Sequence, residues 1–242
     1  MTEKILEEVR EKAFQLCSNQ HLLTEKILVR ARALTPEEAI GNPEGDDFPI
    51  KKGKERLMQA DFRDSLGQAF TDRFGDFEGS VDELFSMPLS NNYRRAIFVA
   101  SLNAIMRNLG LIEGTVHCRD EGPGECAGLL VAHIRDHYGR PRVAQVGFQP
   151  RFVKTLGEAF PLRVLDLDLD NIGTVKYGVK VEGPESGEDA TRWADLFLVT
   201  GTTLVNDTIG DFLKEKPILF YGTTIAGAAA LMGWQRFCAR SF

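Results

Sequence analysis

The spacing of apolar positions changes near the middle of the chain. Up to residue 138, amphipathic helical patterns are mixed with extended runs. After residue 139, short apolar runs such as RVAQVGF and DLFLVTG alternate with helical stretches such as PRFVKTLGEAF. Continuous apolar strands that alternate with helices are typical of a parallel sheet covered on both faces. We therefore predict an α/β chain in which an α+β domain, residues 1–138, precedes a Rossmann-like parallel-sheet domain, residues 139–242.

Start and stop signals place several elements of the first half. An apolar stripe from Leu6 to Leu16 predicts an amphipathic helix, and TPEEAIG and SVDEL each open with a capping box. RLMQADFRDSLGQAFTD predicts a hairpin with its turn at 64–67. SNNYRRAIFVASLNAIMRNLG predicts a buried helix, in which Asn103 needs a hydrogen-bond partner and should tie a neighbouring loop to the core.

Two loops of the second half share the sequence Gly-Thr-Thr. Gly201 and Thr202 follow one predicted strand, with Asn206 beyond them, and Gly222 and Thr223 follow the next. Ligands of open α/β sheets bind at the carboxyl ends of strands, where glycine permits close approach and threonine hydroxyls can hold an anion. These residues are therefore candidate ligand contacts. The alternative is that each threonine only caps the following helix.

The first strand of this half lacks the G-x-G-x-x-G turn of dinucleotide-binding proteins. Gly147 is followed by Phe148, Gln149 and Pro150, whose side chains would obstruct a pyrophosphate. Asp166 does end the next predicted strand, where a ribose-binding acid often lies. One acid without its glycines is weak evidence, so the sequence favours a smaller ligand.

The loop TVHCRDEGPGECAG gathers donors for a metal. Cys118 and Cys126 are candidate soft ligands, and Asp120 and Glu121 are candidate hard ligands or proton-transfer groups. We expect Cys126 in the first turn of a helix, where the macrodipole lowers a thiol pKa. The alternative is that Cys126 packs inward as a small hydrophobe while the acids complement the helix N-terminus.

Charge and targeting signals limit the classes of function. A net charge of -6 argues against binding to duplex nucleic acid, because such affinity rests largely on Lys and Arg. No run approaches the ~18 apolar residues of a membrane helix, and the first residues lack a signal-peptide pattern, so we expect a cytoplasmic protein without a membrane partner. The apolar helices and the segment LFSMPL are compatible with a homodimer or simply with a core.

Many strings of the chain together resemble a known family, the putative heavy-metal chelation family. From about Thr35 onward they are TPEEAIG, DFPIKKGKE, GQAFTD, LSNNYRRAIFVASLNAIMR, TVHCRDEGPGECA, VTGTTLVNDT, FYGTTIAGAAALMG and RFCARS. The resemblance implies a domain similar to the enolase N-terminal domain, a Rossmann-like domain and an active site between them. It also implies the handling of a metal or of a metal chelator, in its synthesis or breakdown.

The resembling strings supply the remaining candidate residues. Polar groups near turns or element ends in these strings are Lys54, Glu55, Asp72, Asn91, Asn92, Cys118, Asp120, Glu121, Thr202, Asn206 and Thr223. Lys54, Glu55, Asp120 and Glu121 are the candidate catalytic groups among them.

We expect a cleft that binds zinc, nickel, cobalt or iron, or a small compound that chelates such a metal. Whether the chain is an enzyme stays open. One alternative is an enzyme that uses a nucleotide-type cofactor such as a methyl donor and keeps its cysteines for structure. Another is a non-catalytic metal sensor or carrier.

Overall fold

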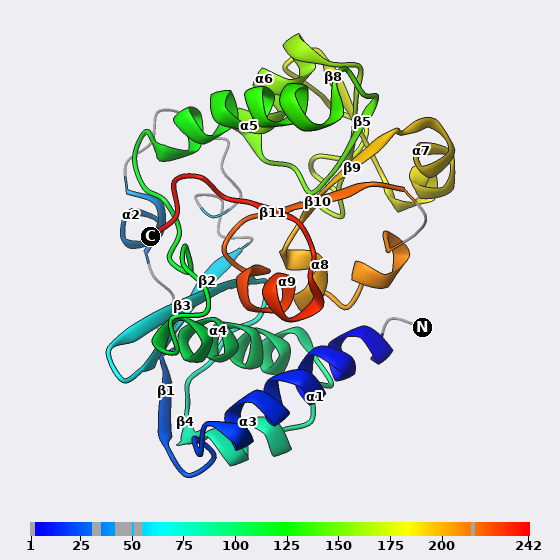
Figure 1. Ribbon diagram of the computed structural model, residues 1–242. Coiled ribbons are helices and arrows are strands. Elements are labelled where there is room, and N and C mark those ends of the chain that lie inside the picture. The colour runs from blue at the N-terminus through cyan, green and yellow to red at the C-terminus, as the bar shows by residue number, and fades with distance from the viewer. Residues whose placement is uncertain (1–2, 31–34, 42–49, 51–54, 214–215) are drawn as a thin grey trace.

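The structure is a computed structural model of the 242-residue chain. It describes residues 3–30, 35–41, 50, 55–213 and 216–242 (Figure 1). The helices of the first half are α1 (Glu3–Asn19), α2 (Pro36–Ile40), α3 (Val81–Ser86) and α4 (Asn92–Asn108). Those of the second half are α5 (Gly122–Tyr138), α6 (Pro150–Ala159), α7 (Gly187–Trp193), α8 (Thr202–Val205) and α9 (Ala226–Met232), with 3-10 turns η2 (Pro184–Ser186) and η3 (Ile209–Asp211).

The first sheet is antiparallel, with the strand order β3-β2-β1-β4. Its strands are β1 (Lys26–Arg30), β2 (Arg56–Phe62), β3 (Ser65–Thr71) and β4 (Phe77–Ser80). The expected hairpin is confirmed, but its turn lies at Arg63 and Asp64, both with positive φ, because Phe62 already pairs with Ser65. Helix α4 packs across β2 and β3.

The second sheet has the order β11-β10-β9-β5-β6-β8-β7, and its described strand pairs are parallel except for the antiparallel pair of β7 and β8. Its strands are β5 (Val143–Val146), β6 (Leu162–Leu165), β7 (Val175–Lys176), β8 (Val179–Glu182), β9 (Leu196–Thr200), β10 (Ile218–Tyr221) and β11 (Arg236–Phe237). The strands that follow β5 in the sequence, β6 to β8, lie on one side of it, and β9 to β11 lie on the other side. This reversal is the topological switch point of a doubly wound sheet.

Alternate residues of the parallel strands enter two different cores. Leu196 and Leu198 of β9 pack under α5 and α6, on the side away from the first sheet (Figure 1). Phe197 and Val199 point to the opposite face and join the larger core. The period of two is the one expected for strands buried on both faces. The predicted α/β class, with an antiparallel and a mostly parallel sheet, is confirmed.

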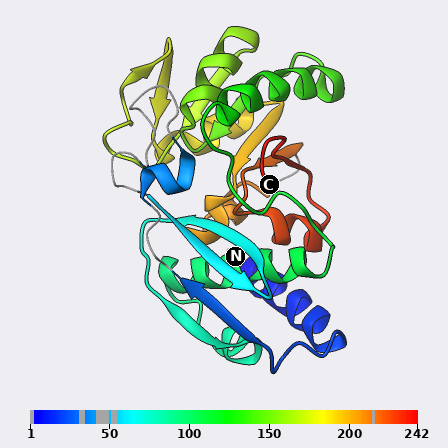
Figure 2. The same ribbon diagram turned by 90° about the vertical axis from the view of Figure 1, so that its left-hand side faces the viewer.

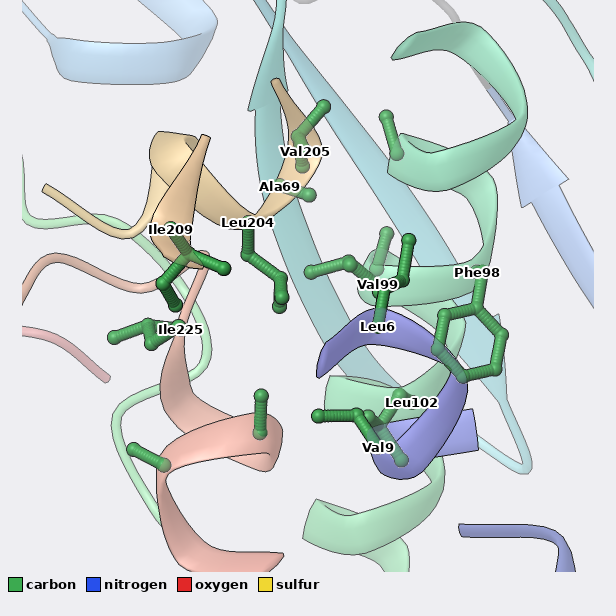
Figure 3. Packing of buried hydrophobic residues seen from close by; sticks show 14 of the residues in the cluster. Leu6, Val9, Ala69, Phe98, Val99, Leu102, Leu204, Val205, Ile209 and Ile225 are labelled. Atoms are coloured by element: carbon green, nitrogen blue, oxygen red, sulfur yellow. The ribbon is translucent and has the colours of Figure 1, made fainter. Parts of the chain in front are cut away.

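The larger core is shared by both halves of the chain. Figure 3 shows Leu6 of α1 and Phe98 of α4 in the same cluster as Leu204 of α8 and Ile225 beside α9. Because the cores are continuous, the two sheets are held together by buried apolar surface. Helix α5, before residue 139, packs with α6 on the second sheet (Figure 2). The boundary at residue 138 and the likeness of the first part to the enolase N-terminal domain stay predictions.

Local start signals form as expected. The capping boxes Thr35–Glu38 and Ser80–Glu83 are present, and Asn91 caps α4 by accepting a hydrogen bond from the N–H of Arg94. Each cap satisfies N–H groups that a helix leaves unpaired at its start.

Asn103 fulfils its predicted role inside α4. Its Nδ2 donates to the carbonyl oxygens of Gln68, Thr223 and Thr224 at 3.0, 3.1 and 3.2 Å, and its Oδ1 accepts from the N–H of Gly227 at 2.7 Å. This one buried amide therefore ties α4 to β3 and to the loop after β10.

Candidate functional site

A cavity of about 760 Å³ lies at the carboxyl ends of the parallel strands. Its walls include Gly147 after β5 and Gly201 after β9, the two strands that flank the switch point. The opposite wall comes from the first half of the chain, with Ile40 of α2 and Phe70 of β3. Small-molecule sites of α/β proteins have this position and this size.

The two Gly-Thr-Thr loops pack against each other at this edge. A Cβ on Gly201 would lie 2.6 Å from the backbone nitrogen of Ile225, so only glycine fits there. Gly222 has φ 93°, which also favours glycine. Gly201, Thr202, Asn206 and Gly222 line the cavity.

The threonines of these loops do not cap helices. The residues that precede α8 and α9 are Gly201 and Ile225, and neither end has a side-chain cap. The hydroxyl of Thr202 lies 3.0 Å from that of Thr200, at the cavity wall. Thr223 does not line the cavity: it is fully buried, and its hydroxyl has no hydrogen-bond partner among the described residues. The helix-cap alternative is therefore wrong for the described geometry.

Three cysteines form one wall, which we call the thiol wall: Cys118, Cys126 and Cys238. Cys118 and Cys126 are buried. Cys238 is brought beside them because Val116 and Phe242 exchange two backbone hydrogen bonds of 2.9 Å. Arg236 reinforces this seam by donating from Nη2 to the carbonyl oxygen of Gly114.

The predicted lowering of the Cys126 pKa is wrong. Burial raises the pKa of Cys126, with a further increase from Cys238, while N–H groups of Ala239 and Arg240 act in the opposite direction. Helix α5 begins at Gly122, so Cys126 is its fifth residue and lies beyond the first turn, where the N–H groups of a helix start act most strongly. Burial also raises the pKa of Cys118 to about 12, helped by Cys238 and Cys126.

His117 extends the thiol wall with a nitrogen donor. Its Nδ1 lies 2.6 Å from the carbonyl oxygen of Cys118, which can only accept, so Nδ1 carries the proton and Nε2 keeps a lone pair. Burial lowers the pKa of His117 to about 4, so the ring is neutral at physiological pH. A histidine that donates its other nitrogen to a carbonyl is the usual arrangement around protein-bound metals.

The described donors do not form a complete metal centre. Among the residues that the structure describes, no group of three His, Cys, Asp or Glu side chains is arranged to hold a metal ion. The thiol wall therefore offers soft ligands to a metal but no closed coordination sphere, which in structural zinc sites needs four ligands.

Carboxylates form a second wall, which we call the acid wall: Glu55, Asp72, Asp166 and Asp168. The carboxyl group of Glu55 is enclosed, although the residue as a whole is half-buried, and burial raises its pKa to about 7. The charges of Asp166, Asp168 and Asp72 add to this increase. Asp166 accepts N–H groups from Phe148 and Asp168, both at 2.6 Å, yet burial still raises its pKa.

Asn92 supports the acid wall from behind. Its Nδ2 donates to Oδ1 of Asp72 at 2.7 Å and to Oδ1 of Asn206 at 3.2 Å, so it joins the ends of β3 and α8. Arg95 holds Asn92 in turn by donating to its Oδ1 at 2.6 Å. Asp72 and Asn206 line the cavity, whereas Asn92 does not.

Part of the chain is similar to a known protein family. Residues 130–225 match the model of the DUF364 family, described as putative heavy-metal chelation. The resemblance stated from the sequence is thereby confirmed over this range, which carries the switch-point loops but neither Glu55 nor the three cysteines of the thiol wall. No curated protein matches the chain.

Two solved structures of DUF364 proteins, both of unknown function, share the fold. One, from Pyrococcus horikoshii, is 15% identical with a TM-score of 0.56 and covers 91% of this chain and 79% of its own. The other, from Desulfitobacterium hafniense, is 14% identical with a TM-score of 0.50 and covers 73% of this chain and 72% of its own. At these identities the likeness concerns the fold alone.

Several predicted residues lie away from the cavity. Asp120 and Glu121 are exposed, and the N–H of Asp120 donates to the carbonyl oxygen of Ile40. Asn91 serves as a helix cap. Lys54 lies outside the described residues. Of the candidate catalytic residues that the structure describes, Glu55 lines the cavity, whereas Asp120 and Glu121 do not.

Sequence reasoning missed other lining residues. Cys238 and Asp168 were not proposed, and Asp166 was weighed only as a ribose ligand. Their positions depend on contacts between distant segments, such as the Val116–Phe242 seam. The repeated acids of LDLDLD after β6 were a usable signal, because strand ends carry ligand contacts in this fold. Across the described part of the chain, no helix is both long and apolar enough to cross a membrane.

Proposed function

We propose that the chain binds a small metal-chelating compound in this cavity, with the chelated metal facing the thiol wall. One observation carries the proposal: Cys118, Cys126 and Cys238 line the cavity together, but the described side chains lack a complete coordination sphere. A chelator that fills the remaining positions would supply what the protein lacks. The family description, heavy-metal chelation, supports the same class of ligand.

The other walls suit an organic ligand. Phe148 and Phe152 provide apolar contact, and the hydroxyls of Thr200 and Thr202 can hold oxygen atoms of a ligand near the switch point. Glu55 provides a group for proton transfer, because a pKa of about 7 lets it both donate and accept protons near neutral pH. We propose that any synthesis or breakdown of the chelator would use this carboxyl group.

Metal analysis of tag-free protein tests the proposal first. We expect metal at near-stoichiometric level in protein purified without chelators. Stripped protein should then bind Ni²⁺ more tightly when equimolar iminodiacetate is present than when Ni²⁺ is offered alone, since iminodiacetate leaves coordination positions open for thiols. Isothermal titration calorimetry measures both affinities.

Cysteine variants locate the metal. The Cys118→Ser/Cys126→Ser double variant should lose most of the binding, because these two thiols, on releasing their protons to bind a metal, would be its soft ligands. Cys17→Ser is the matched control, since Cys17 of α1 is also buried but lies in the larger hydrophobic core. Unchanged metal binding in the double variant would sink the proposed role of these thiols.

A nucleotide-type cofactor is the second candidate. The switch point and the position of Asp166 at the cavity wall favour it, whereas Phe148 stands where a glycine-rich turn would be needed. A cofactor at about 100 times its dissociation constant stabilises a protein by about 2.7 kcal/mol. S-adenosylmethionine, NAD and ATP should therefore raise the melting temperature if this candidate holds. No increase with any of them removes it. Tight reversible metal binding without any chelator would instead indicate a sensor or carrier.

A further inference from the structure

Two histidines of α5 lie outside the cavity. His133 and His137 are four residues apart, so their side chains are neighbours on one face of the helix. Their rings are stacked, with centroids 4.1 Å apart and planes inclined by 28°. Neither residue lines the cavity, and His133 lies about two turns, roughly 10 Å, beyond Cys126 along the helix. The histidine pair is therefore separate from the thiol wall.

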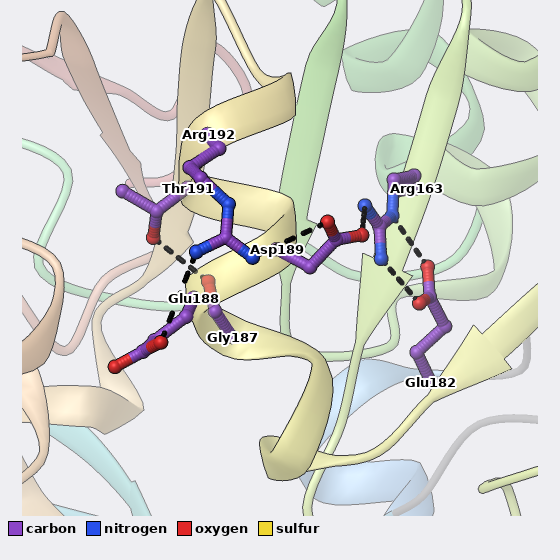
Figure 4. A network of polar contacts seen from close by, with 7 residues as sticks. All are labelled: Arg163, Glu182, Gly187, Glu188, Asp189, Thr191 and Arg192. Atoms are coloured by element: carbon purple, nitrogen blue, oxygen red, sulfur yellow. Dashed lines mark hydrogen bonds and ion pairs between the residues drawn. The ribbon is translucent and has the colours of Figure 1, made fainter.

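The charged cluster around α7 is, in contrast, internally paired. Arg163 donates to both carboxylate oxygens of Glu182, at 2.7 and 2.5 Å, and to Asp189 at 2.7 Å (Figure 4). Arg192 lies 3.6 Å from Asp189 in the same network. Acids and bases satisfy one another here, and their role is to hold α7 against β6 and β8. The histidine pair is different, because no ion pair within the described chain involves either ring.

The helix backbone fixes the tautomer of His137. Its Nδ1 lies 2.9 Å from the carbonyl oxygen of His133, which can only accept, so in the neutral ring Nδ1 carries the proton and Nε2 keeps a lone pair. Metal-bound histidines commonly donate their other nitrogen to a carbonyl in this way. No described residue hydrogen-bonds the ring nitrogens of His133. Each ring therefore has a nitrogen lone pair to offer.

The helix dipole does not account for the position of His133. A histidine that served only to complement a helix C-terminus would be stabilised as a cation, with a raised pKa. Burial instead lowers the pKa of His133 and His137 lowers it further, while Asp136 acts in the opposite direction. The surroundings thus favour the neutral imidazole, which is the form that binds metals.

Contacts with β11 and the residue before it hold this face of α5 in place. The ring of His133 packs against that of Phe237, with centroids 5.2 Å apart. The hydroxyl of Tyr138 donates to Oε1 of Gln235 at 2.6 Å. A pair of side chains that is already positioned loses less conformational freedom when it binds a ligand.

The spacing of the two rings is close to that of a shared metal. With metal–nitrogen bonds of about 2.1 Å that meet at a right angle, two imidazoles have centroids roughly 4.5 Å apart. The observed distance is 4.1 Å, and rotation about χ2, a broad torsion in histidine, turns the two lone pairs toward a common point.

We propose that His133 and His137 together bind a borderline divalent metal ion, such as Ni²⁺ or Zn²⁺, on the surface of α5. Imidazole nitrogen suits these ions, and two histidines four residues apart on a helix are a known way to hold them. Water completes the coordination sphere, since the described chain places no third His, Cys, Asp or Glu side chain with the pair. This site goes beyond the proposed function and does not depend on it.

Nickel titration of metal-stripped protein tests the pair without its main competitor. In the Cys118→Ser/Cys126→Ser variant, which lacks the two buried thiols of the cavity, we expect a Ni²⁺ site to remain. Adding His137→Ala should weaken this binding at least about tenfold, because one imidazole alone loses the benefit of chelation. His137 is exposed, so its replacement leaves the packing of α5 intact. Isothermal titration calorimetry measures the affinities.

His21→Asn is the matched control, since His21 is also exposed but lies after the end of α1. Its φ of 57° suits asparagine. The inference is overturned if Ni²⁺ fails to bind at millimolar concentration, if His137→Ala leaves the affinity unchanged, or if His21→Asn weakens it equally. Mg²⁺ prefers oxygen ligands, so displacement of Ni²⁺ by an equal concentration of Mg²⁺ also contradicts a histidine site.

Nuclear magnetic resonance locates the metal in the unsubstituted chain. Paramagnetic Ni²⁺ should broaden the backbone amide signals of residues 133–138 and of Phe237, which packs on the pair. His133→Gln should remove this local broadening. Signals of residues 133–138 that stay sharp when Ni²⁺ is in excess contradict the proposal, whatever happens near Cys118.

The two metal proposals fail separately. Two imidazoles fill only part of a coordination sphere, so we expect the histidine pair to bind metal more weakly than the thiol wall binds a metal chelate. If Ni²⁺ with iminodiacetate binds through Cys118 and Cys126 while His137→Ala changes nothing, only the histidine site is lost. If Ni²⁺ binding responds to His137→Ala but not to the cysteine substitutions, the proposed chelate at the thiol wall is lost.

Discussion

Two regions of the molecule bury polar groups in opposite ways. At the junction of α4 with the loop after β10, Asn103 makes hydrogen bonds with four backbone groups. At the acid wall, the carboxyl group of Glu55 is enclosed by the protein, and no described residue donates a hydrogen bond to it. Both lie in or beside the surfaces that join the two sheets. The satisfied amide stabilises the junction, whereas the unpartnered carboxylate reduces stability at neutral pH.

This difference distinguishes buried polar groups that stabilise the fold from those that indicate a binding site. A buried group that is fully hydrogen-bonded is explained by the fold alone. A buried ionisable group whose surroundings raise its pKa, in a cavity, indicates a site that a ligand completes. Four substitutions test this distinction, beginning with the largest expected effect.

Asn103→Leu should destabilise the fold by about 3–5 kcal/mol, because it leaves three carbonyl oxygens and one N–H without their partner. Urea unfolding followed by circular dichroism measures the loss. Asn108→Leu, at the partly exposed end of α4, serves as the control and should cost less than about 1 kcal/mol. Equal effects of the two substitutions would show that the junction gains nothing from its buried amide.

Gly201→Ala should cost about 2–3 kcal/mol, because its Cβ would lie 2.6 Å from the nitrogen of Ile225 and push the two Gly-Thr-Thr loops apart. Gly124→Ala is the control, since nothing lies within 4 Å of a Cβ there and alanine favours the helix. Thermal unfolding compares them. A neutral Gly201→Ala contradicts the close packing of the loops.

Glu55→Gln should stabilise the ligand-free protein by about 2 kcal/mol at pH 8. The pKa of Glu55 is about 7 in the folded chain and 4.5 in the reference state, so the folded state holds this proton more tightly. Its favourable contribution is present below pH 4.5 and is lost as pH rises through about 7. Unfolding curves between pH 4 and 8 should show a flatter profile in the variant. Glu158→Gln should leave the profile unchanged, and a parallel response of both variants rules out the linkage.

Thr223→Val should change stability least, between no effect and a gain of about 1 kcal/mol. The buried Thr223 hydroxyl has no described partner, so an isosteric methyl removes an unsatisfied group. Differential scanning calorimetry resolves a change of this size. A clear loss of stability would instead reveal a hydrogen bond of this hydroxyl.

Local signals in the sequence were sufficient for much of the fold. The capping boxes at Thr35 and Ser80 and the cap at Asn91 depend only on residues three positions apart. The alternation of apolar strands and helices predicted the parallel sheet. The need of Asn103 for partners followed from its position in a buried helix. Each of these inferences used interactions that the nearby sequence determines.

The site was predictable only in part, because it is assembled from distant segments. Cys118, Cys126, Asp72 and Glu55 were proposed and line the cavity, but Cys238 joins them through the pairing of Val116 with Phe242. The helix dipole predicted a lowered pKa for Cys126, but burial raises this pKa, and no local sequence pattern reveals that burial. Asp120 and Glu121 lie in the right loop but are exposed.

The seam between Val116 and Phe242 has a kinetic consequence. During synthesis, Cys118 and Cys126 emerge early, whereas the strand and tail that carry Cys238 emerge only after β5 to β10 have been made. Contacts between such distant segments form late in folding, since long loops must close first. The cavity therefore acquires its last wall after most of the sheet is in place. A ligand that contacts all three thiols therefore depends on the pairing of Val116 with Phe242 as well as on the sheet.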